Sequence, residues 1–265
     1  MNILVLSLLS ISFYIFGTFY QGLVYLKKTS AKQFISLLLG TTAVSFQLIV
    51  TLEHIFDGKL FILNFFNSAS LINCVIVICL LLFSNKKPLN PLFLVAYPIS
   101  ALSTLAILVF HDDNQTFSPQ NSGIFIHIIL SIIAYSIFSI AAIQAILIQL
   151  QNKNLKKRNA TLLVRNLPPL LTMENLLFEM LWSGTILLAL AILAGFMFVD
   201  NLFAQHLIHK TALSLLSLAI FSSLLIGRKR YGWRGLTASK WTLWGFSFLM
   251  LGFFGSKLVL EWIIN

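Results

Sequence analysis

Charged residues are scarce in this chain of 265 residues, where Asp, Glu, Lys and Arg together make up only 10% of the sequence. A soluble globular domain usually carries about 25% charged residues. Hydrophobic residues make up 58% of the chain, and the mean hydropathy is +0.91. This composition excludes a water-soluble enzyme, a disordered chain and a nucleic-acid-binding domain.

Cysteine and the common catalytic motifs are also nearly absent. The two cysteines, Cys74 and Cys79, lie five residues apart in one apolar run, which places them about 140° apart on a helix and disfavours a disulfide. No CxxC or CxxCH motif is present, so the chain is neither a c-type cytochrome nor an obvious thiol reductase. It also lacks a P-loop, a GxSxG motif, an HExxH motif and paired carboxylates within an apolar run. We therefore expect a non-enzyme.

What the sequence does contain is a series of long apolar runs. A hydrocarbon core about 30 Å thick needs roughly 20 apolar residues in a helix, and backbone groups in lipid must be satisfied within the helix itself. The runs are 2–26, 32–52, 61–83, 89–110, 123–150, 175–199, 207–226 and 239–263. They predict an all-α polytopic membrane bundle of about eight transmembrane helices, forming a single transmembrane domain over 1–265. The first run has no basic residue before it and no small-residue cleavage site, so we expect a retained span rather than a signal peptide.

The basic residues predict how the chain lies in the membrane. Most of the 18 lysines and arginines fall in four alternate connectors, after the first, third, fifth and seventh runs. Short cytoplasmic loops carry such residues, so both termini are expected outside. The net charge of +10 is thus mainly a topology signal. The partner it indicates is the lipid bilayer and not a nucleic acid, because no aromatic stacking platform accompanies the charges.

All five histidines fall on the outer side of this predicted topology, and His127 is the most informative. Positions i+4 from it read Ser131, Tyr135 and Ser139, which share one helix face among mostly apolar neighbours. A histidine inside a span is a functional hypothesis by default. It predicts an axial ligand or a proton-handling group in a polar seam. The alternative is interhelical hydrogen bonding.

Two further histidines, His206 and His209, lie three residues apart at the start of the run 207–226. At that spacing they can face one side of a helix and bind a metal with a third ligand. The alternative is an interfacial pair in contact with water and headgroups. Since haem iron takes two axial imidazoles from different helices, His127 with a histidine of this pair is a plausible ligand set. We expect His54 and His111, which lie beside aspartates, in solvated loops.

Small residues and prolines give local predictions. Gly245, Gly252 and Gly255 in the last run should permit close helix approach, as should Gly184, Ala191 and Gly195 in the run 175–199. The prolines at 168 and 169 should break the chain before that run, with Thr172 or Asn175 as its cap.

Three segments carry a resemblance to a known family. They are the histidine-led stretch 127–135 (HIILSIIAY), the LPPL stretch at 167–170, and the GWRG stretch at 232–235, which is followed by Phe254-Gly255-Ser256. In their order and spacing the chain resembles the cytochrome c assembly family of membrane proteins, which includes the CcsA-type haem-handling and the HemX-type proteins. The resemblance is strongest over 60–265. The chain is similar to the short inner-membrane members of this family.

In the haem-handling members, outer histidines flank a tryptophan-rich external segment, and together they hold haem. His127 matches the first of those histidines. The stretch 200–210 contains no tryptophan, and the second outer histidine is expected beyond the last run, so this chain resembles members that lack the tryptophan-rich segment. By its position alone, His209 or His206 is a candidate for the second ligand.

The resemblance implies a multi-pass protein of the bacterial inner membrane that binds or traffics haem in cytochrome c maturation. His127 and His209 would be ligands of the haem iron, His206 an alternative ligand, and Ser131 and Tyr135 would line the pocket. Other maturation proteins would be its partners. Two alternatives remain: a HemX-type adaptor or regulator linked to tetrapyrrole synthesis, without stable haem binding, and a small-molecule transporter.

Overall fold

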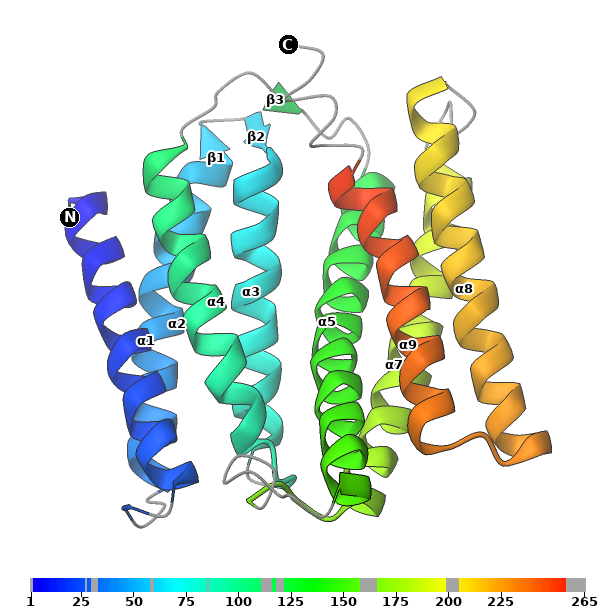
Figure 1. Ribbon diagram of the computed structural model, residues 1–265. Helices are drawn as coiled ribbons and strands as arrows, with labels where there is room; N and C mark the ends of the chain where they lie inside the picture. Colours follow the sequence, from blue (N-terminus) through cyan, green and yellow to red (C-terminus); the bar gives the residue numbers. More distant parts are fainter. Residues whose placement is uncertain are drawn as a thin grey trace. The chain divides into compact units, whose positions relative to one another are not determined.

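The computed structural model describes residues 2–26, 28–29, 33–57, 60–84, 86–110, 116–117, 122–157, 166–198 and 205–255. Its long elements are helices, as predicted (Figure 1). They are α1 (Ile3–Tyr25), α2 (Gln33–Ile55), α3 (Phe65–Phe83), α4 (Asn90–Val109), α5 (Ser122–Lys157), α7 (Leu170–Phe198), α8 (Gln205–Tyr231) and α9 (Gly235–Met250), which continues into the π-helical turn η1 (Leu251–Gly255). Seven of these helices are long and apolar enough to cross a bilayer. The prediction of an all-α, multi-pass membrane protein is confirmed.

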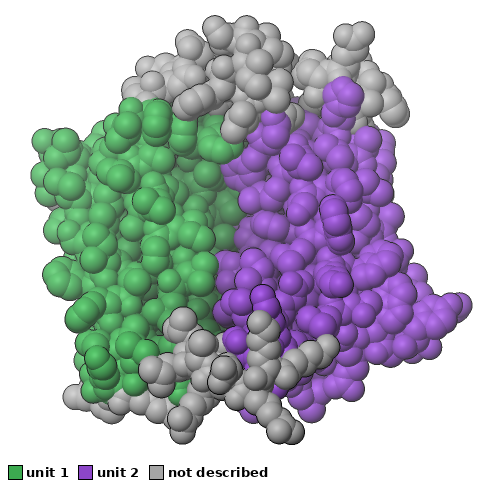
Figure 2. All heavy atoms as spheres, viewed as in Figure 1, with its two compact units in different colours: residues 1–118, 165–167 green, residues 119–164, 168–265 purple. Residues whose placement is uncertain are grey.

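The contacts divide the chain into two compact units, which Figure 2 shows in green and purple. Unit 1 comprises Met1–Ser118 with Arg165–Leu167, and unit 2 comprises Pro119–Val164 with Pro168–Asn265. The single domain over 1–265 that the sequence predicts stays a prediction.

Unit 1 is a ring of four helices. Helix α1 packs against α2 and α4, and α3 packs against the same two helices. A small antiparallel sheet follows α2, with strands β1 (Phe56–Asp57), β2 (Leu60–Ile62) and β3 (Thr116–Phe117) in that order. The sequence did not predict this sheet, because strands of two or three residues leave no periodic pattern. Next to it, the Asn64 side chain caps α3 by accepting a 2.8 Å hydrogen bond from the Asn67 amide.

Unit 2 repeats the same circular order with α5, α7, α8 and α9. Each helix packs against the next, and α9 closes the ring by packing against α5. The sequence showed no internal repeat, yet the two units share this contact order.

The core of unit 2 is built around two stacked phenylalanines. Phe138 of α5 and Phe221 of α8 are fully buried, and their ring centroids lie 4.0 Å apart with an interplanar angle of 8°. A Cβ at Gly245 of α9 would lie 2.6 Å from the Phe221 ring, and one at Gly184 of α7 would lie 3.0 Å from the Phe138 ring. One glycine therefore lies against each ring of the pair, which confirms that these helices approach closely at Gly184 and Gly245.

Two local predictions need correction. Helix α7 begins at Leu170, where the Pro169 carbonyl accepts the Met173 amide at 3.1 Å, so Thr172 and Asn175 lie inside the helix and the predicted caps are wrong. Proline is well suited to a helix start because it has no N–H to satisfy. The basic residues 228–230, predicted in a connector, instead form the last turn of α8. Positive charge there is favoured by the negative end of the helix dipole.

Candidate haem-ligand site and the α8–α9 corner of unit 2

His127 lies one turn into α5 and is half-buried against α7. Its Nδ1 lies 2.6 Å from the carbonyl oxygen of Ala191. A Cβ at Gly195 would lie 3.1 Å from Cε1 of the same ring. The small residues predicted to allow close approach on α7 thus give the imidazole its place between the two helices.

The Ala191 contact fixes which ring nitrogen carries the proton. A carbonyl oxygen only accepts hydrogen bonds, so Nδ1 must be the N–H donor. In the neutral form of this tautomer the lone pair is on Nε2, and no hydrogen bond to Nε2 is found among the described residues. Metal-bound histidines commonly use their second ring N–H in this way, donating to a backbone carbonyl.

Ser131 and Tyr135 continue the polar series along α5, and Tyr135 meets a different helix from His127. The Tyr135 hydroxyl donates to the Leu249 carbonyl of α9 at 3.1 Å, and its ring packs against Phe253 with centroids 5.0 Å apart. Each i+4 step advances about 40° around a helix, so the series turns from α7 toward α9. Ser131 is half-buried. That Ser131 and Tyr135 line a haem pocket stays a prediction.

His209 is exposed on the first turns of α8, and the side chain of His206 lies outside the described residues. In unit 2, α8 packs against α7 and α9. The pairing of His127 and His209 on one iron stays a prediction. Within the described ranges, no three His, Cys, Asp or Glu residues gather into a metal site.

His54 belongs to unit 1 and does not lie in a solvated loop, contrary to the expectation. It is half-buried at the end of α2, where its Nδ1 lies 2.9 Å from the Val50 carbonyl of its own helix. His111, with the aspartates beside it, lies outside the described residues.

The sequence reading missed a buried polar network in unit 1. The Gln47 amide of α2 accepts from Tyr14 of α1 at 2.6 Å and donates to Ser70 of α3 at 3.0 Å and Ser103 of α4 at 3.2 Å. Thr51 extends the network to Ser70 at 2.8 Å. One amide therefore ties together all four helices of the unit. The single glutamine in a long apolar run could have indicated this network, because a side-chain amide in lipid needs hydrogen-bond partners.

The GWRG stretch forms a compact corner between α8 and α9. Gly232 ends α8 with a positive φ of 67°, and its amide donates to the Arg228 carbonyl at 3.2 Å. The Trp233 ring packs over Gly227 and against Trp241, with ring centroids 5.0 Å apart. Gly235 begins α9 with a φ of 56°. The two glycines thus supply the left-handed conformations that the turn requires.

Two arginine side chains connect this corner to α7. Arg234 Nε donates to Oε2 of Glu174 at 3.2 Å, and the Glu174 side chain is only 8% exposed. Arg228 lies 3.7 Å above the Phe178 ring and donates to the Asn175 side chain at 3.1 Å. Two arginines from the α8–α9 region therefore dock on the first turns of α7.

We expect Arg234→Ala to lower the free energy of unfolding by about 1–2 kcal/mol, between the values for exposed and for buried ion pairs. The loss arises because Glu174 stays buried without this partner, so adding Glu174→Gln should recover part of it. Unfolding in detergent measures the stability of the single and the double variant. Arg230→Ala is the matched control, because Arg230 is exposed. Equal effects of Arg234→Ala and Arg230→Ala would contradict a role for the ion pair.

Comparison with known proteins assigns the chain to a family. The cytochrome C assembly protein family matches residues 3–264, a longer stretch than the 60–265 in which the resemblance was expected to be strongest. The inner membrane protein YpjD of Escherichia coli K12 is 29% identical over 207 residues, which is 76% of each chain. Protein HemX of Brevibacillus brevis is 32% identical over 131 residues, covering 49% of this chain and 48% of that protein. No solved structure matches. The chain therefore belongs to the cytochrome c assembly protein family and is a multi-pass protein of the inner membrane.

Proposed function

We propose that this protein binds haem at the outer end of unit 2 and carries it within cytochrome c maturation, with His127 as one axial ligand. The observation that supports this most directly is the hydrogen bond from Nδ1 to Ala191, which leaves the Nε2 lone pair available. The proposal also rests on membership of the family. The protein would act as a binding and transfer protein, not as an enzyme.

The donor chemistry at His127 fits haem. A neutral imidazole with one nitrogen donating to a carbonyl has a fixed ring orientation and an increased basicity at the other nitrogen. Bound haem would supply an iron centre whose axial positions accept such imidazoles. The half-buried ring would partly exclude water from its side of the iron.

The second axial ligand in this proposal is His209, with His206 as the alternative on the same helix. Its exposed position on α8 leaves the imidazole accessible, as a ligand that must be released during transfer requires. Tyr135 would contribute its ring to the pocket, because its hydroxyl already donates to Leu249. Ser131 would supply a hydroxyl between the two.

A second candidate is a membrane adaptor or regulator without stable haem, as considered for HemX-type proteins. The observation that favours it is the same contact: His127 already serves as an interhelical hydrogen bond between α5 and α7. In this reading, the basic residues of the cytoplasmic connectors would contact protein partners.

The visible absorption spectrum of the detergent-purified protein separates the two candidates. With added haem, we expect one haem per chain and the spectrum of a low-spin, bis-imidazole iron. A wild-type protein that retains no haem near one equivalent would overturn the haem proposal and favour the adaptor.

A further inference from the structure

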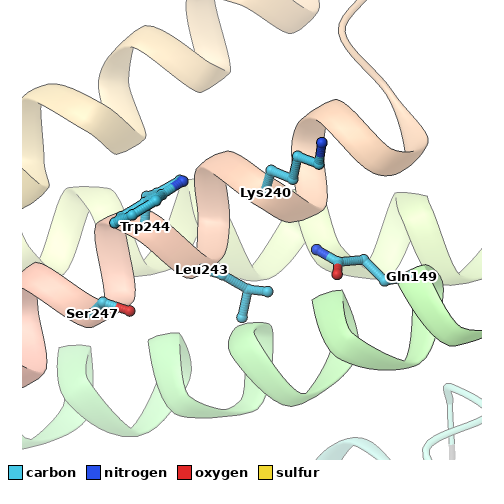
Figure 3. Close-up of a pocket in the computed structure, with 5 residues that line it drawn as sticks. All are labelled: Gln149, Lys240, Leu243, Trp244 and Ser247. Atoms are coloured by element: carbon cyan, nitrogen blue, oxygen red, sulfur yellow. The ribbon is translucent and has the colours of Figure 1, made fainter.

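A pocket of about 200 Å³ lies between α5 and α9 of unit 2, away from the histidines. Lys240, Leu243, Trp244 and Ser247 of α9 line it together with Gln149 of α5 (Figure 3). Figure 3 shows the Gln149 side chain extending from α5 toward the face of α9 that carries Leu243. Nothing in the haem proposal uses these residues.

The pocket is polar and positive at one end. Lys240 is the sixth residue of α9, close to the end of unit 2 that carries the basic residues of α8. In the part of the chain that the structure describes, no carboxylate forms an ion pair with Lys240. An ammonium group and the Gln149 amide are donors that suit a phosphate.

The rest of the pocket is mostly apolar and suits the acyl chain of a lipid. Trp244 is 64% exposed, and Leu243 lies beside it. Lys240, Trp244 and Ser247 follow the i, i+4, i+7 spacing of one helix face, which extends about 10 Å along the helix from the charge. A tryptophan side chain is amphipathic and fits the headgroup level of a bilayer.

The volume indicates that the ligand is held only in part. Sites that enclose a whole drug-sized ligand measure about 300–1,000 Å³, which is more than this pocket offers. A lipid whose headgroup occupies this pocket would therefore continue outside the protein. Trp244 on this face is exposed, so in a bilayer the surroundings of that continuation would be acyl chains.

We propose that this pocket binds one anionic phospholipid of the cytoplasmic leaflet. Its phosphate contacts Lys240 and Gln149, the Ser247 hydroxyl reaches the ester region, and an acyl chain lies along Leu243 and Trp244. The site is separate from the haem proposal and can fail or succeed independently of it.

Quenching of tryptophan fluorescence by brominated lipid tests this directly, because Trp244 lines the site. The protein is reconstituted in phosphatidylcholine with a small, equal fraction of brominated phosphatidylglycerol or brominated phosphatidylcholine. We expect stronger and saturable quenching by the anionic lipid. Lys240→Ala should reduce this preference about fivefold, the effect of one cation near the membrane surface, and Trp244→Phe should remove the excess quenching.

Lys229→Ala is the matched control, since Lys229 is exposed in the last turn of α8 and does not line the pocket. It should leave the preference nearly unchanged. Equal quenching by the two lipids, an equal loss in Lys229→Ala and Lys240→Ala, or excess quenching that persists in Trp244→Phe would each overturn the proposal. Relief of the quenching by inorganic phosphate would also overturn it, because the site would then hold a free anion and not a lipid.

Discussion

Replacement of His127 by alanine is expected to remove the low-spin haem spectrum and to weaken haem binding by more than about 100-fold. Loss of a residue that merely supports a metal ligand costs about 10- to 100-fold, and His127 is proposed as the ligand itself. Absorption titration of the purified variant with haem measures the effect. His209→Ala should lose the spectrum as well if it supplies the second imidazole.

Rescue by free imidazole distinguishes a ligand from a packing residue. In His127→Gly, added imidazole can occupy the vacated position and should restore the low-spin spectrum, which a purely structural role would not allow. His54→Ala is the matched control, since its Nδ1 also pairs with a helix carbonyl, at 2.9 Å, but in unit 1. Retention of the full spectrum in His127→Ala would rule out His127 as an axial ligand.

Gly245→Ala is expected to lower the free energy of unfolding by about 1–3 kcal/mol, the usual cost of overpacking a filled core. The new methyl group would lie 2.6 Å from the Phe221 ring. That ring has little room to move, because it is stacked on Phe138, and the Phe138 ring lies close to Gly184. Thermal unfolding in detergent measures the loss.

A second substitution that makes the Phe221 side chain smaller provides a control for the Gly245→Ala prediction. The combination of Gly245→Ala with Phe221→Leu should be more stable than the sum of the separate effects predicts, because the leucine makes room. Gly255→Ala should be nearly neutral, since its Cβ would meet Leu251 at an ordinary 3.7 Å. A neutral Gly245→Ala would show that α8 and α9 do not depend on this close approach.

The helices were predictable from the sequence because length and apolarity alone decide whether a segment can span a bilayer. All eight predicted runs correspond to helices, with ends that differ by several residues, as at Leu170 and Tyr231. The glycines at 184, 195 and 245 were also recognisable, since small residues in a span have few other uses. Membership of the family followed from the spacing of three short segments.

The partners of each polar side chain were not predictable. Helical spacing places His127 and Tyr135 on neighbouring faces, but only the packing decides that the first meets α7 and the second meets α9. The network around Gln47 depends in the same way on four helices that are distant in sequence. Nothing local in the sequence specifies the grouping of the helices into two rings.

The order of the rings has a consequence for how the protein is made. Unit 1 closes when α4 packs on α1, but it also includes Asn166, whose side chain donates to the Tyr25 carbonyl at the end of α1 at 2.7 Å. This hydrogen bond cannot form until α5 has been synthesised, because Asn166 follows α5 in the chain. Domains fold as units during synthesis, with the N-terminal one first. Helix α5 therefore lacks its partner α9, the last helix of its ring, until α9 has been synthesised. A nascent chain that stops before α9 would therefore contain a complete first ring and an incomplete second ring.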